Sequence, residues 1–128
     1  MPSGTILVAE DDAMVRSFVC SVLQRHGYSV LAAENGAVAL ALAERVGLHR
    51  IDLVLTDVDM PALNGIELVR RLKRLRPDLK IIYMTGHPLR LSELWSDGEV
   101  IEKPFAYGTL LREVDVCLPE ERPLRAGV

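Results

Sequence analysis

The residue best placed for chemistry is Asp57, in a segment over 52–61 that reads Asp-Leu-Val-Leu-Thr-Asp-Val-Asp-Met-Pro. Its apolar run from Leu53 to Leu55 is typical of a central parallel strand that is covered on both faces. We expect this strand to end at Asp57, because Pro61 cannot continue a central strand. Ligands bind beyond the carboxyl ends of parallel strands, so the carboxylate is expected at an edge where chemistry takes place. An isolated Asp-x-Asp is more simply a solvated strand end, and the rest of the chain has to decide between the two interpretations.

Four further polar side chains follow predicted strands: Glu10 and Asp11 after 5–9, Thr85 after 80–84, and Lys103 after 99–102. Together with Asp57 they would place three carboxylates in one crevice, where the charges repel one another unless a cation is present. A hard divalent cation with oxygen ligands, such as Mg²⁺, meets that need. A lysine adds a mobile positive charge, and a threonine hydroxyl can hydrogen-bond an incoming oxygen. These groups suit in-line transfer of a phosphoryl group onto a carboxylate.

Strand-like and helix-like patterns alternate along the chain, and this alternation predicts the fold. We expect strands over 5–9, 28–32, 53–57, 80–84 and 99–102, and helices over 13–26, 37–46, 65–74, 89–96 (short) and 107–118. Asp12 is suited to cap the first helix, and Gly27 to follow its end. The pattern predicts an α/β fold, a doubly wound, flavodoxin-like parallel sheet in the order 2-1-3-4-5 with helices on both faces. The ligand site is then expected where the strand order reverses, between the first and third strands.

Helical spacing also predicts which side chains face the core. These are Val15, Phe18, Val19, Val22 and Leu23 in the first helix, Val38, Ala41 and Leu42 in the second, Leu68, Val69, Leu72 and Leu75 in the third, and Leu110, Leu111, Val114 and Leu118 in the last. A basic run follows in the third helix, made of Arg70, Arg71, Lys73, Arg74 and Arg76, and we interpret it mainly as a solvated face.

The composition is typical of one soluble globular domain, with 49% hydrophobic and 26% charged residues among 128. A net charge of −3 argues against an electrostatic surface for nucleic acid. The sequence shows no apolar stretch near the roughly 20 residues of a membrane span and no signal peptide, so a cytoplasmic location is expected. Cys20 and Cys117 fall in helical patterns and are interpreted as reduced core thiols. We expect one domain over 1–118, followed by a polar tail or linker over 119–128.

The chain resembles the response-regulator receiver domains of two-component signalling from Ile6 to about Leu118. The resemblance rests on Glu10-Asp11, Asp57 with Met60-Pro61 and Gly65, Thr85-Gly86, and Lys103-Pro104-Phe105, which follow one another in the family's order at predicted strand ends. It implies that Asp57 accepts a phosphoryl group from the phosphohistidine of a histidine kinase or histidine phosphotransfer domain. It also implies the supporting roles: direct Mg²⁺ binding by Asp11, help from Glu10 through water, a further ligand in the backbone carbonyl of Asp59, and contacts of Thr85 and Lys103 with phosphoryl oxygens.

The sequence departs from the family pattern at two places. Val100 stands three positions before Lys103, where family members often carry an aromatic switch residue, so the coupling of a rotating ring to Thr85 is called into question. Thr85 and Lys103 are 18 positions apart (103 − 85), which is short for the family and predicts a truncated or irregular fourth helix. The resemblance also puts Asp59 and His87 beside the path by which water reaches the phosphorylated aspartate. We therefore expect both residues to modulate how long the phosphoryl group persists.

The resulting hypothesis is a signalling switch that assists its own phosphorylation and dephosphorylation, is not an enzyme in the usual sense, and responds by conformational change. Its expected partner is the kinase or phosphotransfer domain, without direct contact to nucleic acid or membrane. A homodimer is left open, as is the choice between a stand-alone regulator and part of a hybrid kinase. One alternative is a haloacid-dehalogenase-like phosphatase that uses Asp57 and Asp59, although the chain lacks room for a cap. Another is a flavodoxin-like binding module, in which the acids at 10–12 would repel an FMN phosphate.

Overall fold

The computed structural model describes residues 3–87 and 98–119, and the description below is confined to them. Their elements are β1 (Thr5–Ala9), α1 (Ala13–Arg25), β2 (Ser29–Ala33), α2 (Gly36–Val46), a 3₁₀ turn η1 (Leu48–Arg50), β3 (Leu53–Asp57), α3 (Gly65–Leu75), β4 (Lys80–Thr85), β5 (Glu99–Glu102) and α4 (Tyr107–Cys117). The short helix expected over 89–96 lies outside the described residues. Within the described part, no helix combines the length and the apolar character needed to span a membrane.

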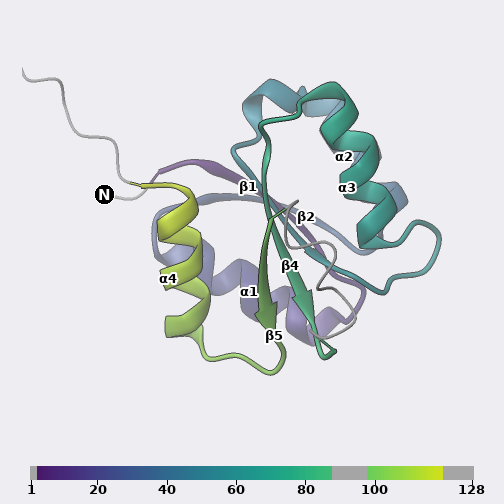
Figure 1. The fold of residues 1–128 in the computed structure, drawn as a ribbon. Coiled ribbons are helices and arrows are strands. Elements are labelled where there is room, and N and C mark those ends of the chain that lie inside the picture. Colours follow the sequence, from purple (N-terminus) through teal and green to yellow (C-terminus); the bar gives the residue numbers. More distant parts are fainter. Residues whose placement is uncertain (1–2, 88–97, 120–128) are drawn as a thin grey trace, which may run out of the picture.

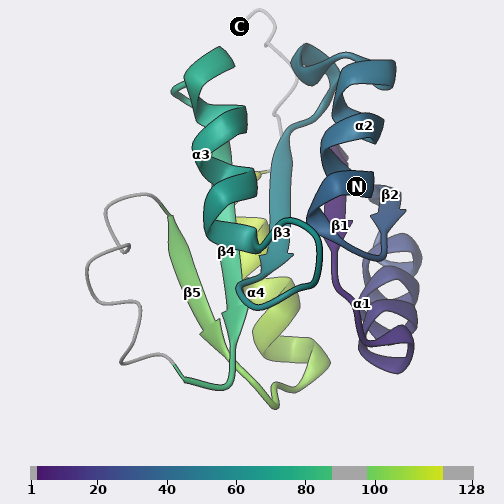
Figure 2. The same cartoon turned by 90° about the vertical axis from the view of Figure 1, so that its right-hand side faces the viewer.

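The five strands form one parallel sheet in the order β2-β1-β3-β4-β5, which confirms the predicted topology (Figure 2). The register aligns Ala9, the last residue of β1, with Thr56 of β3. Asp57 in turn aligns with Met84 of β4. The residue that follows β1 and the residue that ends β3 therefore meet at the carboxyl edge of the sheet, where the strand order reverses.

Helices cover both faces of the sheet, with α2 and α3 on one side and α1 and α4 on the other (Figure 1). Alternate residues of each strand enter the two cores. In β1, Leu7 packs in the core beneath α2 and α3, whereas Ile6 and Val8 pack in the core beneath α1 and α4. This period of two is the normal geometry of a strand. It explains why the buried strands read as continuous apolar runs.

Side-chain caps fix where three of the helices begin. The carboxylate of Asp12 accepts hydrogen bonds from the N–H groups of Met14 and Val15, as predicted for the first helix. Asn35 and Asn64 accept the corresponding bonds at the starts of α2 and α3. Each cap satisfies a backbone donor that has no partner within its helix. Each cap thereby fixes the residue at which its helix begins.

The predicted inward faces are wrong at several positions. Phe18 is 42% exposed, Val38 38% and Leu75 71%, and Ala41 is exposed as well. In α2 the buried residues are instead Gly36, Ala39 and Ala43. A helix that lies on a sheet buries only a stripe, whose centre is set by the neighbouring elements rather than by the apolar residues that could join it. The predictions for Leu68, Val69, Leu72, Leu110 and Val114 are confirmed, since all five are buried.

Candidate functional site

Three carboxylates meet where β1 and β3 end. Glu10, Asp11 and Asp57 each offer an oxygen within 4.8 Å of the others. Glu10 is fully buried and Asp57 is 8% exposed, whereas Asp11 is exposed. The cluster is therefore open to solvent on one side and enclosed on the other. It lies at the switch point of the sheet, where the sequence predicts a ligand site.

Lys103 brings a positive charge to this cluster from the end of β5. Its Nζ lies 2.7 Å from Oε1 of Glu10 and 3.3 Å from Oδ2 of Asp57. The backbone N–H of Lys103 donates to the carbonyl of Thr85 at 2.7 Å, which ties the end of β5 to the end of β4. The lysine is thus held beside both buried carboxylates at once.

Burial and charge act against each other in this cluster. Burial raises the pKa of the Glu10 and Asp57 carboxyls, and Lys103 opposes that rise at both. Burial by itself lowers the pKa of the Lys103 ammonium, but hydrogen bonding and attraction from Glu10 and Asp57 outweigh it and hold that pKa above its usual value. The charged forms of the two acids are therefore costly, and the lysine offsets only part of that cost. A further cation at the cluster would favour the ionised carboxylates.

Glu10 is held by hydrogen bonds to both its side chain and its backbone. Its Oε1 accepts from Lys103, and its Oε2 accepts from the N–H of Asp12 at 3.0 Å. Its backbone N–H donates to the carbonyl of Ala33 at 3.0 Å, and its own carbonyl accepts from Nη1 of Arg16 at 2.9 Å. Arg16 was not identified in the sequence analysis, because its contact joins a helix residue to a backbone atom and leaves no pattern of residue types.

The loop after β3 holds Asp57 in place. The N–H of Val58 donates to the carbonyl of Met84, and the N–H of Gly65 donates to the carbonyl of Val58. The hydroxyl of Thr56 donates to the carbonyl of Asp57 at 2.9 Å. A Cβ on Gly65 would lie 2.0 Å from that same carbonyl oxygen, so only glycine fits. The start of α3 therefore packs directly on the backbone of Asp57.

The remaining predicted residues surround this centre. Thr85 is buried at the end of β4, and its Oγ1 accepts from the N–H of His87 at 3.0 Å. His87 and Asp59 are exposed on the two loops that follow β4 and β3. Val100 is half-buried in β5, where it packs against the core beneath α2 and α3. Its side chain therefore contributes to that core while part of it remains exposed.

The chemistry of the cluster fits a hard cation such as Mg²⁺. All three side chains offer carboxylate oxygens, which are the ligands that this ion prefers. The exposed position of Asp11 leaves room for the water molecules that Mg²⁺ retains. Burial raises the pKa of the Glu10 and Asp57 carboxyls, so their ionised forms are costly, and a divalent ion bound to them would offset that cost.

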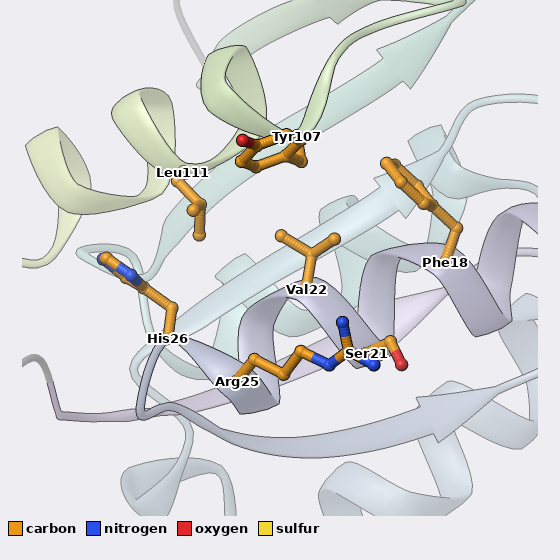
Figure 3. Close-up of a pocket in the computed structure, with 7 residues that line it drawn as sticks. All are labelled: Phe18, Ser21, Val22, Arg25, His26, Tyr107 and Leu111. Carbon is orange, nitrogen blue, oxygen red and sulfur yellow. The ribbon is translucent and has the colours of Figure 1, made fainter.

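Apolar side chains that the sequence analysis assigned to the core, or to which it gave no role of their own, lie beside this site. A groove of about 450 Å³ is lined by Met14, Val15, Phe18, Lys103, Pro104 and Phe105. A second groove of about 400 Å³ continues from Phe18 between α1 and α4, with Tyr107 and Leu111 across from Val22 (Figure 3). The available signal was the position of Met14 and Phe105, which closely follow the strand-end motifs. The shared residue Phe18 joins the two grooves along the face that leads to Lys103.

Comparisons with known proteins agree with this geometry. The family model described as response regulator receiver domain matches residues 6–115. The chain is 39% identical over 117 residues to the response regulator receiver protein CpdR of Brucella abortus, an alignment that covers 88% of this chain and 95% of that protein. It is 35% identical to the transcriptional regulator NtrC of Azospirillum brasilense over 127 residues, which are 96% of this chain but 26% of NtrC.

Two solved structures illustrate the likeness of fold. The chemotaxis protein CheY4 of Vibrio cholerae superposes with a TM-score of 0.82 at 29% identity, covering 91% of this chain and 99% of that one. The response regulator TrrA of Thermotoga maritima, solved in complex with Mg²⁺-BeF, gives a TM-score of 0.79 at 32% identity, with 90% and 99% covered. These likenesses give the phosphatase alternative no support. The chain belongs to the response regulator receiver domain family.

Proposed function

We propose that Asp57 is the phosphoacceptor of this receiver domain and that a histidine kinase or a histidine phosphotransfer domain supplies the phosphoryl group from a phosphohistidine. The observation that carries the proposal is the position of Asp57 at the end of the central strand, with Lys103 Nζ at 3.3 Å and two further carboxylates in reach. The relatives support the donor class, because one of them is a sensor kinase, CckA of Brucella abortus, which is 39% identical over 85 residues.

The transfer forms one bond and breaks one. A carboxylate oxygen of Asp57 attacks phosphorus in line with the phosphorus–nitrogen bond of the phosphohistidine, and the electron pair of that bond returns to the imidazole nitrogen. Lys103 offers its ammonium to the negative charge that spreads over the phosphoryl oxygens. The Thr85 hydroxyl, at the end of the neighbouring strand, can donate a hydrogen bond to one of them. The energetic contribution of these groups is electrostatic and positional.

Asp11, Asp57 and the backbone carbonyl of Asp59 would hold the Mg²⁺, with Glu10 behind them through water. When bound, the ion would neutralise the carboxylates and the charge of the transferring group. Glu10 already gives both carboxylate oxygens to Lys103 and to the Asp12 N–H, which supports an indirect role for it. The exposed position of Asp11 supports a direct role for its carboxylate as a Mg²⁺ ligand.

The donor domain is expected to approach over the grooves that share Phe18. Met14 is 83% exposed, and it lines the same groove as Lys103 and Phe105. Apolar side chains exposed beside a reacting group are typical of a contact surface for a protein partner. A partner seated on this face would bring its phosphohistidine to the carboxyl edge of the sheet.

Labelling of the purified domain by acetyl phosphate with Mg²⁺ tests the assignment. Asp57→Asn keeps the shape of the side chain and removes the nucleophilic oxygen, so stoichiometric labelling should vanish. Asp59→Asn is the matched control, since it makes the same change two residues away, and it should still be labelled. Labelling that persists in Asp57→Asn, or that is lost only in Asp59→Asn, would refute the assignment.

A further inference from the structure

We propose that Arg16 is a positioning residue for the metal-binding carboxylate of Asp11. This inference rests on the proposed function, because it assumes that Asp11 is a direct Mg²⁺ ligand. The observation behind it is the hydrogen bond from Nη1 of Arg16 to the backbone carbonyl of Glu10, at 2.9 Å. The guanidinium touches neither of the acidic side chains in this contact, and its action on the site passes through the backbone.

The carbonyl that Arg16 holds belongs to the peptide bond before Asp11. The carbonyl of Glu10 and the N–H of Asp11 lie in one rigid plane, so a donor that fixes the carbonyl also fixes the orientation of the Asp11 backbone. The Glu10 N–H is already bonded to Ala33, at the end of β2. The N–H of Asp12 also donates to Oε2 of Glu10, at 3.0 Å. The peptide groups on both sides of Asp11 are therefore held, which limits the directions in which its exposed side chain can leave the backbone before any ion arrives.

Helix α1 provides the anchor for this contact. The N–H of Arg16 donates to the carbonyl of Asp12 at 2.9 Å, and the carboxylate of Asp12 caps the same helix. Arg16 is half-buried, so its side chain is not a freely moving surface group. The planar guanidinium of an arginine loses less conformational freedom per hydrogen bond than the flexible ammonium of a lysine would. The hydrogen bond from Arg16 to the Glu10 carbonyl therefore links α1 to the residue that follows β1.

Charge and position predict opposite effects on metal affinity, which makes the role testable. Arg16 is a cation close to the Glu10–Asp11 backbone, so by charge alone it disfavours a second cation there. Removing it would then tighten Mg²⁺ binding. If Arg16 holds the ligand in place, removing it weakens binding, because a ligand oriented by its supporting contacts binds metal better.

The experiment is a calorimetric Mg²⁺ titration of the unphosphorylated domain for four variants. Arg16→Gln should weaken Mg²⁺ binding by about tenfold, the lower end for loss of a contact that supports a metal ligand. Arg16→Lys keeps the charge and one donor, and it should recover part of the affinity. Arg25→Gln, the matched control, removes the same charge from the exposed last turn of α1 and should bind as wild type does. Asp11→Ala, which removes the proposed ligand, should weaken binding more than any of them.

The four variants distinguish a failure of the Arg16 positioning role from a failure of the proposed Mg²⁺ site at Asp11. If Asp11→Ala weakens binding but Arg16→Gln binds equally well or more tightly, the positioning role is wrong and the metal site stands. If wild type and Asp11→Ala bind equally, both proposals are wrong. A chemical-shift change of the Asp11 amide in metal-free Arg16→Gln, together with unchanged shifts in the core of β3, is expected, and it distinguishes local loosening from unfolding. Unchanged Asp11 shifts would also overturn the inference.

Discussion

At the scale of single residues, the site is defined by carboxylates that the fold makes costly to ionise. Burial raises the pKa of Asp57, and Lys103 opposes that rise only in part. The unfolded chain releases this proton near the ordinary value of 3.8, whereas the folded domain holds it to higher pH. Between these two pKa values the folded domain binds more protons than the unfolded chain. The free energy of unfolding of the metal-free domain therefore decreases as the pH rises above 3.8.

Asp57→Asn removes this titration, so the variant should gain stability over wild type as the pH rises from about 4 towards neutrality. Urea unfolding in the presence of EDTA at several pH values measures the difference. Asp78→Asn is the control, because Asp78 is an exposed carboxylate before β4, at the opposite edge of the sheet. A difference between Asp57→Asn and wild type that shrinks with rising pH would contradict the argument.

Asp59 and His87 are exposed residues on the loops that follow Asp57 and Thr85. We expect Asp59→Ala or His87→Ala to change the rate of dephosphorylation by roughly tenfold, because positioned acid–base groups contribute about 10²–10⁴-fold and exposed ones less. Mg²⁺ affinity should stay nearly the same. The measurement is the decay of the phosphorylated domain after the donor has been removed. Equal decay in wild type and both variants would show that these are ordinary loop residues.

At the scale of elements, the contact between β3 and α3 positions the phosphoacceptor. A methyl group on Gly65 would lie 2.0 Å from the Asp57 carbonyl oxygen, a distance that forces the backbone to move. Gly65→Ala should therefore lower the free energy of unfolding by about 2–3 kcal/mol, as overpacked sites do. It should also slow phosphorylation, because the displaced backbone carries the nucleophile.

Gly108→Ala is the matched control for this prediction. Within the described residues, a Cβ at Gly108 would have no atom within 4 Å apart from its chain neighbours and the backbone of its own helix, and the residue lies in the first turn of α4. Alanine there should raise the free energy of unfolding by about 0.5–1 kcal/mol, because glycine is unfavourable within a helix. Denaturant unfolding and acetyl phosphate labelling of both variants test the pair. Equal stability of Gly65→Ala and wild type would show that the start of α3 can move away from the Asp57 carbonyl without loss of unfolding free energy.

At the scale of the whole molecule, stability comes from two apolar cores on opposite faces of the sheet. Leu72 and Leu75 follow one another on the same predicted face of α3, yet Leu72 is 1% exposed and Leu75 is 71% exposed. Leu72→Ala should cost about 2–5 kcal/mol of unfolding free energy, because it leaves a cavity. Leu75→Ala should change it by less than about 0.5 kcal/mol. Urea unfolding of the two variants measures both changes. Similar losses of unfolding free energy in the two would show that Leu75 contributes to the core as much as Leu72 does.

The sheet and the candidate site could be predicted from the sequence because both follow from local patterns. Apolar runs separated by helical patterns require parallel strands, and the right-handed crossover rule leaves few possible orders. Polar residues directly after those runs must lie at the carboxyl edge, whatever the details of packing. Glu10, Asp11, Asp57 and Lys103 were therefore expected together, and the structure brings them together.

Only the tertiary structure decided the contacts that depend on neighbours distant in the sequence. Helical spacing shows which residues share a face, but the adjacent helix decides how wide a stripe is buried, and so Phe18 and Leu75 lie outside it. Likewise, a hydrogen bond between the Arg16 side chain and a backbone carbonyl depends on how α1 lies against β1. The sequence determined which groups reach the sheet edge, because strand ends are local, and packing decided which groups hold them there, because support comes from across the fold.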